Sequence, residues 1–67
     1  MLQLNAEDTT LYLTVLLNFG IPKYEGNSLD AAKDAAVSTG FECVVLKDQQ
    51  LVLSWSPISG WLNHSAD

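Results

Sequence analysis

Hydrophobic and polar residues alternate along residues 10–19. Every odd position in this block is apolar, and four of the five even positions carry a hydroxyl or an amide. One face would hold Leu11, Leu13, Val15, Leu17 and Phe19, and the other Thr10, Tyr12, Thr14, Leu16 and Asn18. A period of two residues is typical of a strand, because successive side chains point to opposite sides of a sheet. The block therefore predicts a β-strand.

A helix over residues 6–19 is the alternative interpretation of the same block. Asn5 followed by Asp8 resembles a capping box, and Gly20 with Pro22 resembles a glycine-terminated helix followed by a stop proline. On a helix, however, the apolar residues would cover roughly two thirds of the circumference, wider than the usual stripe of about 100°. We therefore prefer the strand.

The clearest element is an alanine-rich helix over residues 29–39. Asn27 or Ser28 can cap its start, and Gly40 follows its end. The predicted buried stripe consists of Leu29, Ala32, Ala36 and either Val37 or Thr39, with Asp30, Lys33 and Asp34 facing water. Before this helix, residues 20–26 contain Pro22 and two glycines, and predict a loop with a short extended piece at Lys23 and Tyr24.

Residues 41–47 and 50–56 are rich in β-forming residues and predict a hairpin that turns at Asp48 and Gln49. A two-residue turn would place three pairs on one face, Leu46–Leu51, Val44–Leu53 and Glu42–Trp55, and two on the other, Val45–Val52 and Cys43–Ser54. An isolated hairpin is marginal in water, so the first block is expected to add a third strand.

The predicted fold is α+β, with strand order along the chain β-α-β-β, a small antiparallel three-stranded sheet and one helix packed on one face. The alternative is α-α-β-β, with residues 6–19 helical. One helix covers one face, so Val45, Val52 and Phe41 need another cover. That cover would be Leu2 and Leu4, the tail around Trp61, or another protein.

The length of the chain makes a partner physically useful. Its 67 residues predict a single small domain over 1–67, with 1–8 and 63–67 expected to be flexible. This is below the roughly 70–80 residues at which one core is comfortably stable. One cysteine and one histidine supply neither a disulfide nor a structural metal site within one chain. Self-association, as a dimer, is the remaining way to add stability.

Charge narrows the class of partner. Eight acidic residues against three basic ones give a net charge of −5, which opposes binding to nucleic acid and to anionic membranes. A basic protein is favoured instead. The first eight residues lack the basic start and apolar run of a secretory signal, and the longest apolar stretch is about half a membrane span. We therefore expect a cytoplasmic protein.

The sequence predicts no catalytic, cofactor-binding or metal-binding residues. Cys43 lies inside a predicted strand and is expected to be a buried, unreactive thiol. His64 is expected in a solvated tail. Neither Glu7 with Asp8 nor Asp30 with Asp34 has the apolar surroundings that raise a carboxyl pKa for acid–base catalysis. We therefore expect a protein that is not an enzyme.

Two groups of residues are candidates for protein binding. Trp55, Ile58 and Trp61 lie close together in the sequence, and tryptophan dominates interface hot spots. In a domain of 67 residues, however, both rings are more simply core residues. Glu25, Asp30 and Asp34 follow one another along the loop and helix and would suit a basic partner, or would simply form a solvated face.

The segment from Ser28 to Lys33, the helix that follows, the hairpin at Asp48 and the late Trp61 resemble the layout of small phage and mobile-element proteins, including some anti-CRISPR proteins. The resemblance extends over residues 10–62 and implies a protein that binds a host protein and blocks it, in the host cytoplasm. The hairpin lacks the charged glycine turn of that group, and no functional residues are transferred from it.

These observations favour a small acidic protein-binding module that inhibits a host protein. The alternative is a homo-oligomeric structural or assembly subunit without catalytic activity.

Overall fold

The computed structural model describes residues 10–64, which form one helix and five strands. The elements are β1 (Tyr12–Leu16), β2 (Ile21–Gly26), α1 (Leu29–Thr39), β3 (Cys43–Lys47), β4 (Gln50–Ser56) and β5 (Gly60–Asn63). The α+β class, the single helix and the antiparallel sheet agree with the sequence-based prediction. The predicted number of three strands was wrong, because β2 and β5 were not foreseen.

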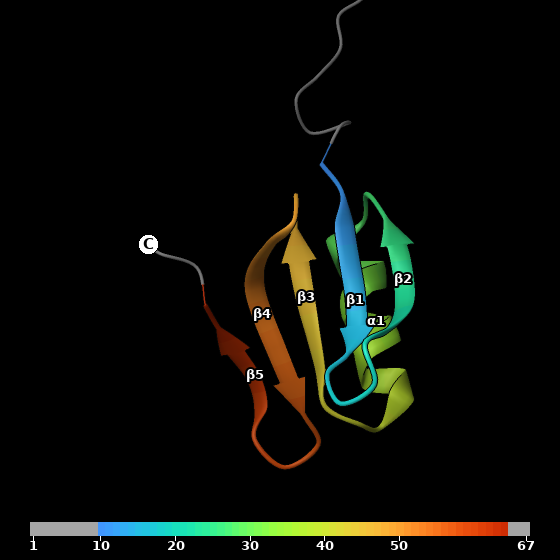
Figure 1. Ribbon diagram of the computed structural model, residues 1–67. Coiled ribbons are helices and arrows are strands. Elements are labelled where there is room, and N and C mark those ends of the chain that lie inside the picture. Colours follow the sequence, from blue (N-terminus) through green and yellow to red (C-terminus); the bar gives the residue numbers. More distant parts are fainter. Residues whose placement is uncertain (1–9, 65–67) are drawn as a thin grey trace, which may run out of the picture.

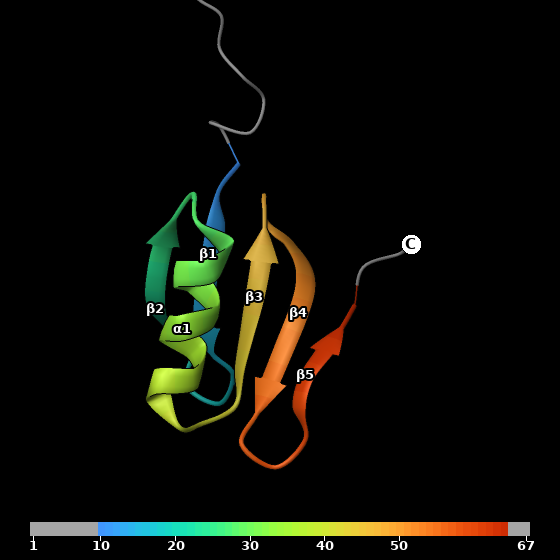
Figure 2. The same ribbon diagram turned by 180° about the vertical axis from the view of Figure 1, so that it is seen from behind.

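The strands form one sheet in the order β2-β1-β3-β4-β5, and every neighbouring pair is antiparallel. β2 and β3 flank β1, and α1 crosses from one to the other on one side of the sheet (Figures 1 and 2). The helix contacts β1, β2 and β3, whereas β4 and β5 extend beyond it. The other side of the sheet faces the viewer in Figure 1.

The first block forms a strand, so the helical alternative was wrong for β1; residues 6–9 lie outside the described part. β1 ends at Leu16, earlier than expected, because residues 17–20 turn the chain back into β2. The Gly20 amide donates to the Leu16 carbonyl at 2.8 Å, and Gly20 has φ +66°, a conformation that glycine adopts readily. β2 replaces the predicted loop. Pro22 is tolerated in it because β2 is an edge strand.

α1 begins and ends where the capping residues predicted. The Ser28 hydroxyl accepts from the Ala31 amide at 3.1 Å, and Gly40 closes the helix with φ 72°. Ala32 and Ala36 are fully buried as predicted. Leu29, however, is 36% exposed, because it lies in the first turn at the border of the sheet that α1 covers.

At the last turn, Val37 is exposed and Thr39 is half-buried, so Thr39 is the member of the predicted stripe that packs inward. The Thr39 hydroxyl donates to the Ala36 carbonyl at 2.8 Å. The side of the helix that meets the sheet is therefore built from small side chains.

The β3–β4 hairpin turns at Asp48 and Gln49 as predicted, with φ of 50° and 72°, both positive as in a type I′ turn. Leu46 opposes Leu51, also as predicted. Beyond that pair the predicted register was wrong by one residue. The observed pairs are Val45–Leu53, Val44–Ser54 and Cys43–Trp55.

A bulge between Val45 and Leu46 causes this shift, because β4 has one extra residue there. Leu53 and Trp55 consequently share a face with Val45 and Cys43, the face that α1 covers. Val45 was expected on the uncovered face, but it is fully buried beneath the helix.

The core lies between α1 and the sheet and is small. Its buried residues are Thr14, Leu16, Ala32, Ala36, Cys43 and Val45. The Thr14 hydroxyl donates to the Ala32 carbonyl at 2.8 Å, so the one buried polar side chain among them is satisfied. Trp55 and Trp61 pack against this core where the helix no longer covers the sheet.

The end of the described chain belongs to the sheet. Trp61 lies within β5, and the His64 amide donates to the Val52 carbonyl at 2.7 Å. Residues 1–9 and 65–67 lie outside the described residues, and with them the expected cover by Leu2 and Leu4 and most of the segments expected to be flexible. Within residues 10–64 no helix has the length and apolar character that a membrane crossing requires.

Candidate protein-binding face

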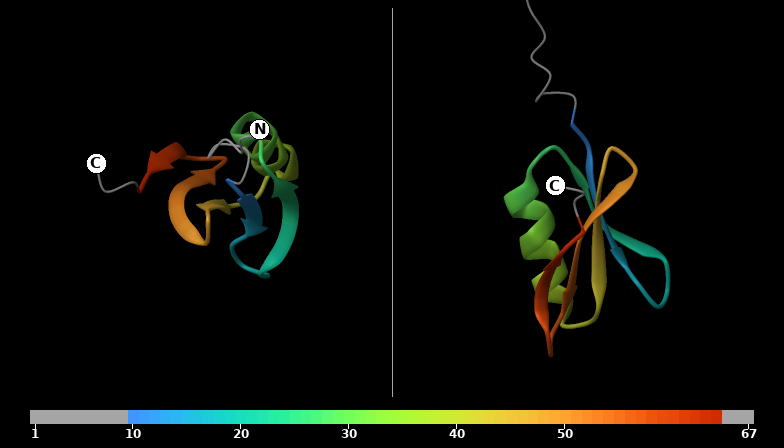
Figure 3. Two further views of the ribbon diagram at one scale, coloured as in Figure 1. Left: turned by 90° about the horizontal axis from the view of Figure 1, so that it is seen from above. Right: turned by 90° about the vertical axis from the view of Figure 1, so that its left-hand side faces the viewer.

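The sheet side opposite α1 is lined by apolar side chains. We call it the open face, and it is formed by Leu11, Leu13, Val15, Leu17, Val44, Leu46, Leu51 and Leu62. Two cross-strand rows place these residues together. One row is Pro22–Val15–Val44–Ser54–Leu62 across all five strands, and the other is Glu25–Leu13–Leu46–Leu51 across four. Among residues 10–64 no second layer packs on this side, and Figure 3 shows α1 on the other side alone.

Exposure grows from the middle of the open face toward its border. Leu13, Val15, Val44 and Leu46 on the two central strands are half-buried by their neighbours. Leu17, Leu51 and Leu62 are 53%, 44% and 59% exposed. Soluble monomers rarely present so continuous an apolar patch unless it is an interaction site.

The alternation in β1 explains why this face is apolar. Tyr12, Thr14 and Leu16 face α1, and Leu13 and Val15 face away. The inward orientation of Thr14 is possible because its hydroxyl bonds the Ala32 carbonyl of the helix. The strand therefore directs its more hydrophobic side away from the only helix described.

Acidic side chains border the open face. Glu25 opposes Leu13 across the β1–β2 pair. Its neighbour Tyr24 points to the helix side, where the Tyr24 hydroxyl accepts from the Ser28 amide at 3.2 Å, so Glu25 points the other way. Glu42 precedes buried Cys43 and likewise points away from α1.

All three lysines lie on the helix side of the sheet. Lys33 belongs to α1, with its Nζ 5.1 Å from the centre of the Trp61 ring. Lys23 lines a cleft with three helix residues, and Lys47 lines a hollow with Leu29 of the helix. The two faces of the sheet thus differ in two ways: the helix packs on one of them, and the lysines lie on that same side, whereas Glu25 and Glu42 border the other.

The predicted binding residues do not form one surface. Trp55 and Trp61 are half-buried on the helix side, with ring centres 6.4 Å apart and planes tilted by 51°. Ile58 is 94% exposed at the turn between β4 and β5. The tryptophans thus contribute to the core, and only Ile58 of this group is fully presented to solvent.

The three predicted acidic residues are divided between the two sides. Glu25 lies at the open face, whereas exposed Asp30 and Asp34 lie on α1. Glu42, which sequence reasoning placed in the hairpin but did not select for binding, is the second carboxylate at the open face.

Comparisons with known protein families, curated proteins and solved structures found no match.

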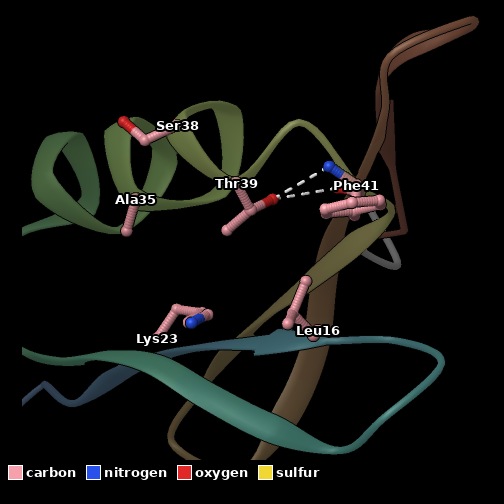
Figure 4. A pocket seen from close by; sticks show the side chains of 6 residues that line it. All are labelled: Leu16, Lys23, Ala35, Ser38, Thr39 and Phe41. Atoms are coloured by element: carbon pink, nitrogen blue, oxygen red, sulfur yellow. Dashed lines mark hydrogen bonds between the residues drawn. The ribbon is translucent and has the colours of Figure 1, made fainter.

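A cleft of about 400 Å³ lies between the C-terminal half of α1 and the strands β1 and β2 (Figure 4). Ala35, Ser38 and Thr39 of the helix face Leu16 and Lys23 across it, and Phe41 lies at its end. The Phe41 amide donates to the Thr39 hydroxyl at 3.1 Å. This hydroxyl is therefore already engaged, and the lysine is the single charged group of the lining.

One hydroxyl–imidazole pair lies at the border of the open face. Ser54 Oγ and His64 Nε2 are 2.8 Å apart, although His64 was expected to be merely solvated. A catalytic triad also requires a group that orients the second ring nitrogen, together with donors for an oxyanion. The hydrogen bonds of residues 10–64 place no carboxylate on His64 Nδ1, so the pair is read as a structural contact between β4 and the end of β5.

Potential metal ligands and the thiol suggest no further chemistry. Within the described range, no three His, Cys, Asp or Glu side chains come together as they would around a metal ion. Cys43 is 1% exposed, as expected for a buried thiol, and contacts the Thr39 hydroxyl at 3.2 Å.

Sequence reasoning did not select the residues of the open face as a site. Two signals for it were present: the apolar alternation in residues 11–17 and the Leu46–Leu51 pair. What was missing was which side the helix would cover.

Proposed function

We propose that this chain is a small protein-binding module and that the open face is its binding surface. One observation carries the proposal: eight apolar side chains line a sheet face on which no described element packs. Burying a large apolar side chain is worth roughly 1.5–3 kcal/mol, so a partner gains substantially by covering even a few of them.

The shape of the surface suits a macromolecule better than a small substrate. A pocket for a small molecule is concave and encloses most of its ligand. The open face is instead an extended sheet surface, with one hollow of about 180 Å³ at the end near Leu17 and Leu62. A broad apolar surface with a polar border is the usual anatomy of a protein interface.

We include inhibition of the partner and a cytoplasmic location in the proposal, since the resemblance to small phage proteins implies both. A module of this size, in which residues 10–64 bring together no catalytic constellation, acts most simply by covering a surface that its partner needs.

Site-specific photocrosslinking in the cells that naturally make the protein tests this proposal. A photoreactive residue at Leu62 should give adducts of discrete mass, whereas one at Val37, exposed on α1, should give none above background. Leu46→Ser with Leu51→Ser should abolish the Leu62 adducts, because both substitutions remove apolar contact area from the open face. Adducts of equal yield at Leu62 and Val37 would contradict the proposal.

A homo-oligomeric assembly subunit is the second candidate. It is favoured by the small core, in which Val45 and Leu16 are the largest buried aliphatic side chains. Covering the open face with another copy would add the stability that one core of this size supplies poorly. Sedimentation of the purified chain decides between the two: a dimer at micromolar concentration that Leu46→Ser with Leu51→Ser dissociates would favour self-assembly.

A further inference from the structure

We propose that the partner of the open face is another protein whose contact surface has an apolar centre flanked by lysine or arginine side chains. This inference rests on the proposed function and adds the chemistry of the partner to it.

The two carboxylates of the open face border its apolar centre at different places. Glu25 lies on the edge strand β2, beside Leu13. Glu42 lies just before β3, where its carbonyl accepts from the Leu17 amide at 3.0 Å. Both side chains are exposed, so each is free to meet a cation at the rim of an interface. Rim charges of this kind select the partner and steer its approach more than they add affinity.

No lysine shares this side of the sheet within residues 10–64, and the one imidazole at its border, that of His64, is hydrogen-bonded to Ser54 Oγ. Lys23 and Lys47 line hollows that α1 helps to form, and Lys33 lies over the Trp61 ring. A partner that presents acids would therefore meet only like charge at the open face. A partner that presents bases would meet two carboxylates with no competing lysine between them.

The same segregation argues against a second copy as the occupant. In a symmetric dimer both copies use the same patch. An open-face dimer would bring together Glu25 and Glu42 of each copy, and the described lysines would remain on the outer sides. The acids would then meet no lysine, so a partner that presents lysine or arginine is the better match.

A titration with two synthetic amphipathic peptides tests the inference on the full chain. Each peptide is a helix with a leucine stripe; the first has lysines beside the stripe, and the second has glutamates at the same positions. The backbone amide shifts of the ¹⁵N-labelled chain locate the contact and give the Kd. The lysine peptide should shift amides of β1, β3 and β4, and its Kd should rise with salt because rim charge pairs are screened.

Two double variants of equal net charge separate rim chemistry from overall acidity. Glu25→Gln with Glu42→Gln should raise the Kd of the lysine peptide roughly fivefold, the effect of two exposed charge pairs. Asp30→Asn with Asp34→Asn, on α1, should leave the Kd within about twofold, since long-range effects are screened at physiological salt. The amide spectra of both variants report whether the fold is retained.

Each other outcome overturns a defined part of the argument. If the glutamate peptide binds the open face as tightly as the lysine peptide, the basic partner is wrong and the binding face stands. An equal loss of affinity in both double variants would mean that only net charge matters, which also overturns the inference. Shifts outside the open face, or none, would overturn the inference and the proposed function together. A salt-stable dimer through the open face would replace the basic partner by a second copy.

Discussion

Val44 and Val45 are neighbours on β3, yet they belong to two different environments. Val45 is fully buried beneath α1, opposite Thr14 of β1. Val44 lies in the row that crosses the open face, and no described element packs over it. The covered side of the sheet buries Thr14, Leu16, Cys43 and Val45 against the alanines of α1, whereas the leucines and valines of the open side stay partly or largely exposed.

The comparison teaches that hydrophobicity alone did not decide which side became the core. A helix lined with alanine approaches a sheet closely, and such an approach suits small side chains and a satisfied hydroxyl such as that of Thr14. Of the leucines in the described sheet, Leu16 and Leu53 lie on the helix side and the others lie on the open face. Residues 10–64 thus contain more apolar side chains than their fold buries, and this excess is the physical basis of the proposed binding.

The largest expected difference in stability is between two variants of β3, one with a charge on the covered side and one with a charge on the open face. Val45→Asp should abolish cooperative folding, because an unpaired buried carboxylate costs roughly 3–5 kcal/mol, comparable with the whole stability of a small domain. Val44→Asp, its matched control, should cost about 1 kcal/mol. Urea unfolding followed by tryptophan fluorescence measures both. Equal losses would show that the open face is already covered by the chain itself.

A smaller effect is expected where the covered side passes beyond the helix. Trp61→Ala should lower the free energy of unfolding by about 2 kcal/mol, because the half-buried ring packs on the cluster of Leu16, Ala36 and Cys43. Ile58→Ala should leave it unchanged, since Ile58 is almost fully exposed. Thermal unfolding of both variants checks this prediction, and an unchanged Trp61→Ala protein would return Trp61 to the list of binding anchors.

Replacing the polar residue on the helix side of β1 should change the free energy of unfolding by about 1 kcal/mol. Thr14→Val keeps the shape but removes the hydrogen bond to the Ala32 carbonyl, so it should destabilise the protein by that amount. Val15→Thr on the open side should change stability by less than about 0.5 kcal/mol. The urea concentrations at the unfolding midpoints of the two variants give this difference, provided that the free energy of unfolding depends equally steeply on urea concentration in both. A stabilised Thr14→Val protein would mean that the hydroxyl is tolerated beneath the helix rather than favoured there.

The smallest predicted change in the free energy of unfolding concerns the turn that joins β3 to β4. Gln49 has φ +72°, which glycine adopts without strain, so Gln49→Gly should raise the free energy of unfolding by about 0.5 kcal/mol. Gln50→Gly in β4 should lower it, because glycine weakens strand interiors. Thermal midpoints of the two variants report the sign directly. A loss of stability in Gln49→Gly would argue against a turn of type I′.

Local chemistry predicted the helix well, since Ser28 and Gly40 act on adjacent backbone groups and need no distant contact. The hairpin turn and the Leu46–Leu51 pair follow from local sequence in the same way. The two missed strands have weaker signals: β2 contains Pro22 and β5 has four residues. Their pairing depends on β1 and β4 being in place, which no window of sequence contains.

In the candidate site, too, residue types could be recognised from the sequence, whereas their positions depended on distant contacts. The sequence marked Trp55 and Trp61 because of their residue type, and the fold used them to extend the core. The alternation of the sequence showed the leucines of the open face, but it did not indicate which side of the sheet the helix would leave uncovered. The one-residue bulge at Val45 and Leu46 alone reverses the faces of Leu53 and Trp55.

By itself, the sequence determined the capped helix over residues 29–39, the turn of the antiparallel hairpin and the excess of acid, and it favoured a strand with two unlike sides over a helix in the first block, because each depends on neighbouring residues or on composition. Only the tertiary structure decided that the helix lies on the side of Thr14 and Val45, and that Glu25 and Glu42 border the side it leaves open. The physical reason is that cover and register are set by contacts between distant segments, where one bulge and one satisfied hydroxyl outweigh the local hydrophobic pattern.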